Sequence, residues 1–305
     1  MANSSFSIRI PGSTSNLGAG FDTLGLALAI YLDLTVEPAG GDDVGTLDLT
    51  GEGESSSPFG PDNLIHTAFR FAGAREGVDA PAVRFTAHNG IPFERGLGSS
   101  AAAIVAGIVA FSIASGRGLS NDRIIELGTA MEGHGDNAGP STVGGLITCC
   151  QREGAPPLVV RTDWPRDIRA VVAIPELPIP TAEARAILPG SVSRADAIFN
   201  VQRAALFHAA LGAGEWDKLG EAMRDRLHQP YRAGLLPGLA EALELETGGP
   251  LVGVALSGAG SAVLALATGD FEAIGERLAG CFRAEGIATT VRMLDVEREG
   301  WRMLG

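Results

Sequence analysis

Short stretches of alternating hydrophobic and polar residues mark the first half of the chain. Such alternation predicts strands, because successive side chains of a strand point to opposite faces of a sheet. The strands expected from this pattern are Phe6–Ile10, Leu32–Glu37, Thr46–Thr50 and Ala82–Ala87. Where apolar residues recur three and four positions apart, the pattern predicts helices instead. The helices expected in this half are Leu64–Arg75, Ser99–Ser115 and Asn121–Met131, the last of them capped by Ser120.

The second half mixes the same two patterns. Its expected strands are Ile168–Ile174, Leu251–Leu256, Ser261–Ala267 and Ala288–Leu294. Its expected helices are Ala182–Ile187, Ser193–Leu211, Trp216–Arg226 and Phe271–Arg283. A polar, proline-containing stretch, Gln151–Pro157, separates the halves, so we expect one domain over residues 1–154 and another over residues 155–305. Because short links between strands are frequent, we expect an α+β fold rather than a doubly wound parallel sheet.

Composition narrows the classes of protein. The chain has 305 residues, 45% of them hydrophobic and 19% charged, with a net charge of −13 and no basic run. Since nucleic-acid binding depends on clustered Lys and Arg, we expect no nucleic-acid partner, whereas a small anionic ligand remains compatible with a locally positive pocket. The longest apolar run, Ala101–Ala114, is shorter than the roughly 18 residues that a membrane span needs. The first ten residues lack the pattern of a signal peptide, so we expect a cytoplasmic protein without a membrane partner.

Three cysteines, Cys149, Cys150 and Cys281, are too few and odd in number for a disulfide framework. This usage suits a reducing compartment. Cys149 and Cys150 lie in the apolar stretch Gly145–Cys150, and we expect both to be buried core thiols rather than metal ligands.

A loop rich in glycine and serine, Gly96–Ala101, follows an expected strand and opens an expected helix. Glycines let the backbone curl around a ligand, and the start of a helix offers unpaired N–H groups to a phosphate. Serine hydroxyls add hydrogen bonds or a ligand for hydrated Mg²⁺. The loop lacks the Gly-Lys-Ser/Thr ending of a P-loop, so a nucleotide would be bound in another way. A simple turn that caps a hydrophobic helix explains the motif equally well.

Three more polar segments are candidates for a site: Pro11–Asp22, Glu132–Asn137 and Leu256–Ser261. Asn and Asp side chains in the first can bind an amine or hydroxyl, or only stabilise turns. The carboxylate and His of the second can hold Mg²⁺ and orient a hydroxyl, or form a solvated loop. The small-residue turn of the third admits a ligand or simply joins two strands. Two arginines, Arg185 and Arg232, can bind a carboxylate or phosphate, although each can also be a surface charge.

Together and in this order, these segments resemble the GHMP small-molecule kinases, and among them the homoserine kinase family. Further stretches resemble that family specifically: Thr181–Pro189, Ala197–Leu206 and Asp225–Leu236. The resemblance spans nearly the whole chain. It implies an N-terminal domain like ribosomal protein S5, a C-terminal ferredoxin-like domain and, as a possible assembly, a homodimer. It also implies transfer of the γ-phosphate of ATP to the side-chain hydroxyl of L-homoserine, with Mg²⁺, toward threonine.

The resemblance also implies a role for particular residues. Those expected to bind the nucleotide are Asn63, Pro92, Arg95, Gly96, Leu97, Gly98, Ser99, Ser100, Ala101 and Thr181. Those expected to bind the hydroxy amino acid are Asn16, Asp22, His134, Asn137, Arg185, Arg232 and Gly258. Ser100 and Glu132 are expected to hold the metal. The residues expected to take part in catalysis are Asn16, Ser100, Glu132 and Asn137.

The chain departs from the usual family pattern at Gly135, Gly139 and Ser261. Because two of these positions adjoin the expected acceptor site, extra room there would admit a bulkier acceptor. Another hydroxy amino acid or a small alcohol is therefore an alternative substrate, and a binding protein without catalysis is an alternative function. We expect direct, metal-assisted attack by the hydroxyl without a dedicated base, with Asp136 as the alternative base.

Overall fold

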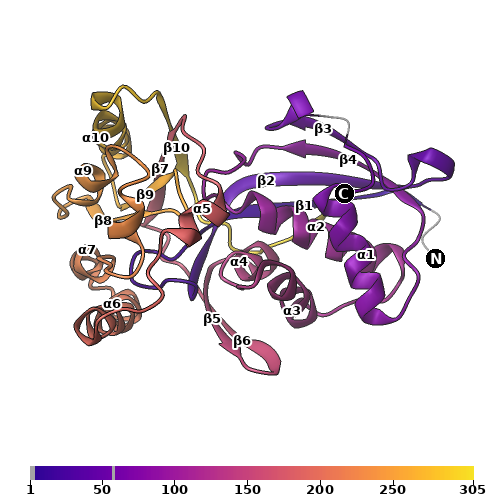
Figure 1. Cartoon of the computed structure of the whole chain (residues 1–305), viewed down its shortest axis with the longest axis horizontal. Helices are drawn as coiled ribbons and strands as arrows, with labels where there is room; N and C mark the ends of the chain where they lie inside the picture. The colour runs from indigo at the N-terminus through magenta and orange to yellow at the C-terminus, as the bar shows by residue number, and fades with distance from the viewer. Residues whose placement is uncertain (1–3, 57–58) are drawn as a thin grey trace.

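The computed structural model describes residues 4–56 and 59–305, whose strands form two separate sheets (Figure 1). The first sheet has seven strands in the order β11-β1-β2-β4-β3, with β5 paired to β2 and β6 paired to β5. Its strands are β1 (Phe6–Ser15), β2 (Leu24–Pro38), β3 (Leu47–Gly51), β4 (Val83–Asn89), β5 (Leu146–Arg152), β6 (Ala155–Thr162) and β11 (Arg302–Leu304). All pairs are antiparallel except β3 with β4.

Four helices accompany the first sheet on the right of Figure 1: α1 (Leu64–Glu76), α2 (Ser99–Ala114), α3 (Asn121–Glu132) and α4 (Ala138–Val143). α2 contacts each of the other three and β1, which explains why it is apolar on every side. A Cβ at Gly107 would lie 2.2 Å from the carbonyl oxygen of Ile65, so this glycine is needed for the close approach of α1. The expected cap is confirmed, because the Ser120 side chain accepts a hydrogen bond from the backbone of Arg123.

The second sheet has four antiparallel strands in the order β10-β7-β9-β8. They are β7 (Arg169–Pro175), β8 (Leu251–Leu256), β9 (Val263–Ala267) and β10 (Thr289–Leu294). The helices of this half are α5 (Thr181–Ala186), α6 (Arg194–Ala213), α7 (Leu219–Ala222), α8 (Gln229–Arg232), α9 (Leu239–Leu243) and α10 (Phe271–Ala284). Short 3₁₀ helices occur at Gly41–Asp43, Glu54–Ser56 and Trp216–Lys218. The α+β expectation is confirmed, and α5 lies between the two sheets (Figure 1).

Three local expectations differ from the structure. The stretch Trp216–Arg226 is not one helix but a 3₁₀ turn followed by the short α7, after which Asp225 turns the chain. The stretch that we took only as a linker contains the start of β6, and both β6 and β11 extend the first sheet beyond residue 154.

Within the described residues, no helix has the length and apolar character to cross a membrane.

The expectation that both adjacent cysteines are buried is wrong for Cys150. Cys149 is 2% exposed, whereas Cys150 on the opposite face of β5 is exposed. Successive side chains of a strand alternate between faces, and at this point only one face of β5 is covered. Burial and the charge of Asp136 raise the pKa of Cys149 to about 11, so its thiol stays neutral.

Candidate active site

The glycine-rich loop Gly96–Ala101 lies at the end of the connection from β4 to α2 and includes the first residues of α2, at the boundary between the two sheets. Three hydrogen bonds hold the loop and the residue before it: Ser13 N to Leu97 O (3.1 Å), Ser257 Oγ to Gly96 O (2.6 Å) and Ala262 N to Arg95 O (3.0 Å). One anchor therefore comes from β1 and two come from the β8–β9 turn of the second sheet. The loop delivers the chain to the N-terminus of α2, where the first-turn N–H groups are available to an anion.

Gly98 is required in this loop by the packing of the chain itself. A Cβ there would lie 2.2 Å from Ser13 Oγ, and the residue has a φ of +72°. Substitution of Gly98 would therefore distort the chain's own packing.

Ser100 and Glu132 meet at the start of α2, where Ser100 Oγ donates to Glu132 Oε1 over 2.8 Å. The second carboxylate oxygen, Oε2, is buried and has no hydrogen-bond partner among the described residues. Burial raises the pKa of Glu132 to about 6, while the charge of His134 and the bond from Ser100 oppose the shift. An orphaned carboxylate oxygen beside a hydroxyl suits Mg²⁺, which prefers hard oxygen ligands and retains waters. The expected metal pair therefore fits the structure.

His134 and Asp136 form a close pair, with Nδ1 2.5 Å from Oδ1. Asp136 is 1% exposed. Burial disfavours the charged ring, but the hydrogen bond and charge of Asp136 outweigh it and raise the pKa of His134. Asp22 joins this pair, since one ligand atom from each of the three residues lies within 4.8 Å of the others.

Opposite charges meet where α5 faces the loop after β1. Arg185 donates to both carboxylate oxygens of Asp22, over 3.1 and 2.8 Å, and the pair is partly exposed. Arg232 is only 2% exposed and donates from Nε to Ala184 O and from Nη1 to Gly258 O, each over 3.0 Å. Burial and the charge of Arg185 lower the pKa of Arg232 to about 10. The alternative of a surface charge is thus excluded for Arg232.

Two asparagines organise the same region. Asn16, at a φ of +74°, donates to Gly258 O over 2.9 Å and accepts from the backbone N–H of Asp22 over 3.0 Å. The Asn137 amide accepts from Ser13 Oγ over 3.0 Å and donates to Ser15 Oγ over 3.1 Å. These bonds tie β1 to the turn of the second sheet and to the start of α4.

The other expected nucleotide residues lie at three places: the start of α1, the segment before the glycine-rich loop and the start of α5. Asn63 caps α1 by accepting from His66 N, and its amide donates to Gly45 O and Gly60 O, so its polar atoms are engaged within the chain. Pro92 is buried, and Arg95 donates to the carbonyls of the two preceding residues. Thr181 is exposed at the start of α5, one turn before Arg185. No contact among the described residues joins Asn63 to the Ser100–Glu132 pair.

Sequence reasoning missed several residues that build the site. Ser13, Ser15 and Ser257 are at most 2% exposed and hold Asn137 and the glycine-rich loop. A run of small polar residues inside a buried strand was the signal for the first two. Phe21 was also missed, although its ring lies 5.4 and 5.9 Å from the guanidinium carbons of Arg232 and Arg185.

The glycines that depart from the family pattern do not widen the site. A Cβ at Gly135 would lie 2.7 Å from both Cys149 Sγ and Thr129 Oγ1. A Cβ at Gly139 would lie 2.9 Å from Ile147 Cγ2. The space left by both glycines is filled by side chains of β5 and α3, so the expectation of extra room for an acceptor is wrong.

Gly135→Ala is expected to lower the free energy of unfolding by about 1–3 kcal/mol, the usual cost of overpacking. Cys149→Ala in the same background should restore part of the loss, because it removes one of the two clashing atoms. Denaturant unfolding measures both effects. Gly280→Ala in α10 is the matched control, since nothing lies within 4 Å of its Cβ position; it should gain about 0.5–1 kcal/mol. Equal stability of parent and Gly135→Ala would contradict the packing account.

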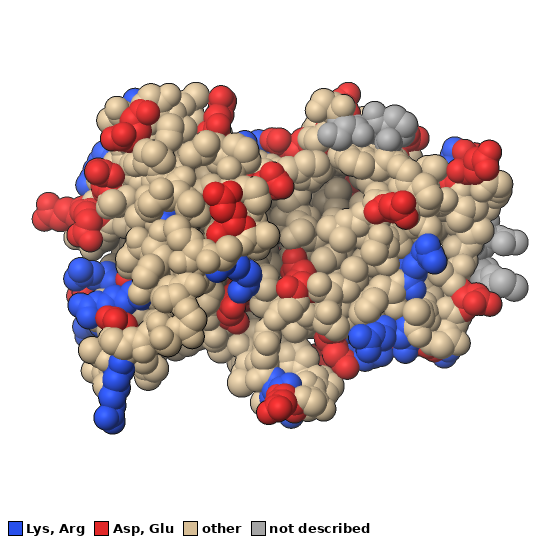
Figure 2. Space-filling model, viewed as in Figure 1, with Lys and Arg blue, Asp and Glu red and all other residues tan. Residues whose placement is uncertain are grey.

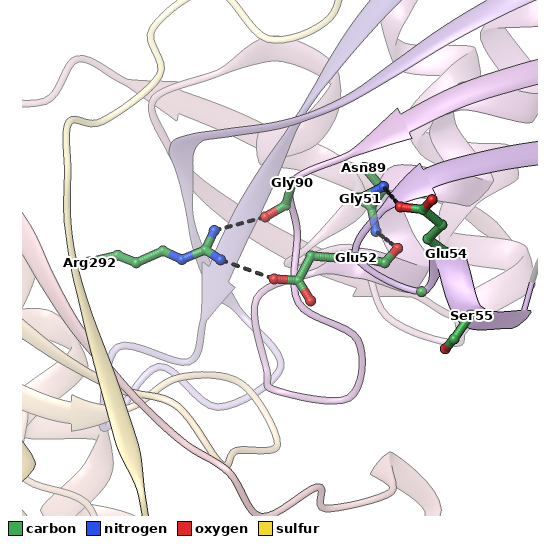
Figure 3. A pocket seen from close by; sticks show the side chains of 8 residues that line it. Gly51, Glu52, Glu54, Ser55, Asn89, Gly90 and Arg292 are labelled. Atoms are coloured by element: carbon green, nitrogen blue, oxygen red, sulfur yellow. Dashed lines mark hydrogen bonds and ion pairs between the residues drawn. The ribbon is translucent and has the colours of Figure 1, made fainter.

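A cavity of about 540 Å³ lies beside the segment that leads into the glycine-rich loop (Figure 3). Arg292 of β10 crosses to it and donates to Gly90 O over 2.9 Å and to Glu52 Oε1 over 3.0 Å. Gly53, in its lining, packs so closely on Phe93 that a Cβ would lie 2.0 Å from the ring. The second sheet is thereby joined to the β3–β4 end of the first. Figure 2 shows the face hollowed between the two halves.

Comparison with known proteins agrees with this architecture. Residues 63–145 match the GHMP kinases N-terminal domain, and residues 207–284 match the GHMP kinases C-terminal domain. A homoserine kinase from Moorella thermoacetica is 38% identical over 287 residues, covering 94% of this chain and 96% of the relative. A homoserine kinase from Persephonella marina is 40% identical over 296 residues, covering 96% of each.

Solved structures show the same fold. A homoserine kinase from Cytophaga hutchinsonii superposes with a TM-score of 0.84 at 23% identity, covering 100% of this chain and 98% of the other. Lactococcus lactis galactokinase, complexed with galactose, gives a TM-score of 0.69 at 16% identity, covering 98% and 95%. Kinases of different name thus share the two-domain fold. The two relatives that are 38% and 40% identical in sequence are both homoserine kinases. The chain belongs to the homoserine kinase family of the GHMP kinases.

Proposed function

We propose that this enzyme transfers the γ-phosphate of ATP to the side-chain hydroxyl of L-homoserine and forms O-phospho-L-homoserine, a step toward threonine. The observation that carries the proposal is the cluster in which Asp22 pairs with Arg185, and Arg232 lies beside them against the ring of Phe21, close to the Ser100–Glu132 pair. An amino acid carries an ammonium and a carboxylate, and this pocket offers one partner for each. Arg185 is close enough to Glu132 for the charge of each to affect the pKa of the other.

The Asp22–Arg185 pair must open when the acceptor binds. In the structure each group neutralises the other. An incoming ammonium would take the Asp22 carboxylate, and the incoming carboxylate would take the arginines. Because the pair is partly exposed, separating it costs little, about 0–1 kcal/mol. The pocket thus keeps its charges paired until a zwitterion replaces both contacts.

The N–H groups at the start of α2 are placed to bind the phosphates of ATP. Ser100 and Glu132 would hold Mg²⁺, which supplies positive charge to the phosphates when bound. The acceptor hydroxyl oxygen forms a bond to the γ-phosphorus as the bond to the β–γ bridging oxygen breaks, and ADP leaves with that electron pair. The hydroxyl proton passes to a phosphoryl oxygen and then to water.

No dedicated base is needed in this scheme. Asp136, the alternative base, is buried and paired to His134, whose raised pKa favours the imidazolium form. Its Oδ1 is already engaged by the His134 ring, so this oxygen is not available to accept the hydroxyl proton. His134 and Asp136 therefore orient the acceptor end of the site.

The nucleoside end of ATP would extend from the glycine-rich loop toward the cavity beside Phe93. That ring is 41% exposed, which leaves a face for a purine, and it lies beside the open groove lined by Gly53. In this arrangement Asn63 does not contact ATP itself. Its amide donates to Gly45 O and Gly60 O and so holds the loop that leads into α1.

The test of the proposed function is an acceptor panel with ATP consumption as the readout and ³¹P NMR of the product. We expect kcat/KM for L-homoserine to exceed those for L-threonine and L-serine by at least about tenfold, because the filled space at Gly135 and Gly139 keeps the pocket small. Equal turnover of all three would remove the acceptor assignment and leave the kinase. No ATP consumption with any hydroxy compound would favour the binding-protein alternative.

The three cysteines are free, which suits a reducing cytoplasm. The proposed substrates are small soluble metabolites, which agrees with that location.

A further inference from the structure

The segment Asp225–Arg232 forms a turn next to the acceptor residues, and its buried side chains are Asp225, His228, Gln229 and Arg232. The Asp225 carboxylate accepts from the Asn200 amide over 2.7 Å and from the backbone N–H groups of Leu227, His228 and Gln229 over 2.9, 2.8 and 2.7 Å. Four donors on one carboxylate fix the turn from which His228 projects. The ring of His228 is 0% exposed.

His228 links the two halves of the acceptor pocket. Its Nε2 lies 2.9 Å from Gly18 O, in the loop between Asn16 and Asp22. A carbonyl can only accept, so Nε2 carries the proton and the neutral ring leaves Nδ1 as an acceptor. Arg232 Nη1 lies 3.2 Å from that Nδ1. Burial lowers the pKa of His228, with Asp225 opposing, and this favours the neutral form.

The guanidinium of Arg232 is thereby fixed in its plane. Nε donates to Ala184 O, and Nη1 donates to both Gly258 O and His228 Nδ1. Among the described residues, Nη2 makes no hydrogen bond. The ring of Phe21 stacks on His228 at 5.0 Å and also lies under the guanidinium. Three protein acceptors thus set the orientation and leave one nitrogen for a ligand.

We propose that His228 is a positioning residue that holds the free Nη2 of Arg232 toward the carboxylate of the acceptor. This inference rests on the proposed function, in which Arg232 binds that carboxylate. His228 touches neither substrate nor metal, and its effect passes through Arg232. The second contact, to Gly18 O, fixes the proton on Nε2 and so leaves Nδ1 as the acceptor for Arg232.

Two variants separate the contacts of the ring. His228→Asn places an amide near Nδ1 and keeps an acceptor for Arg232, while it loses the donor to Gly18. His228→Gln places an amide near Nε2 and keeps that donor, while it loses the acceptor. Both remove the stacked ring, so each is the matched control of the other. Circular dichroism melting first establishes that each variant is folded.

The assay compares L-homoserine with 3-aminopropan-1-ol, which has the same amine and hydroxyl but no carboxylate. We expect His228→Gln to raise KM for L-homoserine about tenfold, with kcat and KM for ATP within about threefold, whereas His228→Asn should change KM less than threefold. With 3-aminopropan-1-ol, kcat/KM should be equal in all three proteins.

Equal rises in both variants, or equal losses with 3-aminopropan-1-ol, would overturn the inference and leave His228 a packing residue. If His228→Gln does not fold, His228→Asn decides alone: a KM within threefold supports the inference, and a tenfold rise overturns it. A parent that does not phosphorylate L-homoserine would overturn the proposed function itself, so the two failures are distinguishable.

Discussion

Glu132→Gln is expected to lower kcat by at least about a thousandfold and, at the same time, to stabilise the metal-free protein above pH 6. The catalytic loss follows from the loss of one negative charge at the metal pair with Ser100, and effects of this size are common for groups that stabilise transition-state charge. Steady-state assays over a range of Mg²⁺ concentrations should also show a higher Mg²⁺ requirement.

The gain in stability follows from the raised pKa of Glu132. Burial raises that pKa from the usual 4.5 to about 6, so the folded state prefers the neutral acid. The penalty for the ionised carboxylate is absent below pH 4.5, develops as the pH rises through about 6, and then amounts to roughly 2 kcal/mol. Glutamine avoids it. Denaturant unfolding in EDTA should show equal stabilities at pH 4.5 and a more stable variant at pH 8.

Glu126→Gln is the control on the same helix. Glu126 pairs with Arg123 at the surface and has no contact with Ser100 among the described residues. Its loss should leave kcat unchanged and alter stability by less than about 1 kcal/mol. If Glu132→Gln kept the parental Mg²⁺ curve, Glu132 would be a structural residue.

Asp22→Asn is expected to raise KM for L-homoserine at least about thirtyfold, equivalent to about 2 kcal/mol, while KM for ATP stays unchanged. The amide cannot neutralise the ammonium of the acceptor, and it also leaves Arg185 without its partner. Initial-rate kinetics with each substrate varied in turn measure both constants.

Asp33→Asn is the matched control for this prediction. Arg9 holds Asp33 with two hydrogen bonds of 2.6 Å, the same bidentate arrangement, on β1 and β2 away from the pocket. It should affect stability to a similar small extent and leave both KM values unchanged. A similar KM for L-homoserine in parent and Asp22→Asn would mean that the ammonium binds elsewhere.

The elements that periodicity predicts well are those whose own residues decide their conformation. α1, α2, α3 and α10 match their expected bounds to within two residues. α1, α3 and α10 each have an apolar face, α2 is a continuous apolar run, and a glycine follows the end of each helix within two residues. The turn Leu256–Ser261 was also predicted, and the resemblance implied both domains. β6 was missed because two prolines and a polar flank resemble a linker, and only the pairing with β5 makes it a strand.

Within the candidate site, the motifs indicated the residue types that meet ligands but not the residues that hold them. Asp22, Arg185 and Arg232 come together although more than 160 positions separate the first from the second. The partners of Asn137 on β1, and the chain from Asp225 through His228 to Arg232, depend on tertiary contacts that no local pattern encodes. The same holds for Gly135. Its lack of a side chain matters because Cys149 Sγ lies where a Cβ would be, and that contact depends on the tertiary fold.

The pairing of β11 with β1 affects how the chain can fold during synthesis. Ser7, Ile8 and Arg9 meet Leu304, Met303 and Arg302, so the outer edge of β1 stays open until the whole second sheet has left the ribosome. A nascent chain stalled after Thr162 carries every other strand of the first sheet and still exposes backbone donors and acceptors along that edge. Domain-by-domain folding from the N-terminus is therefore incomplete for this protein, and the open edge stays able to pair with other chains until synthesis ends.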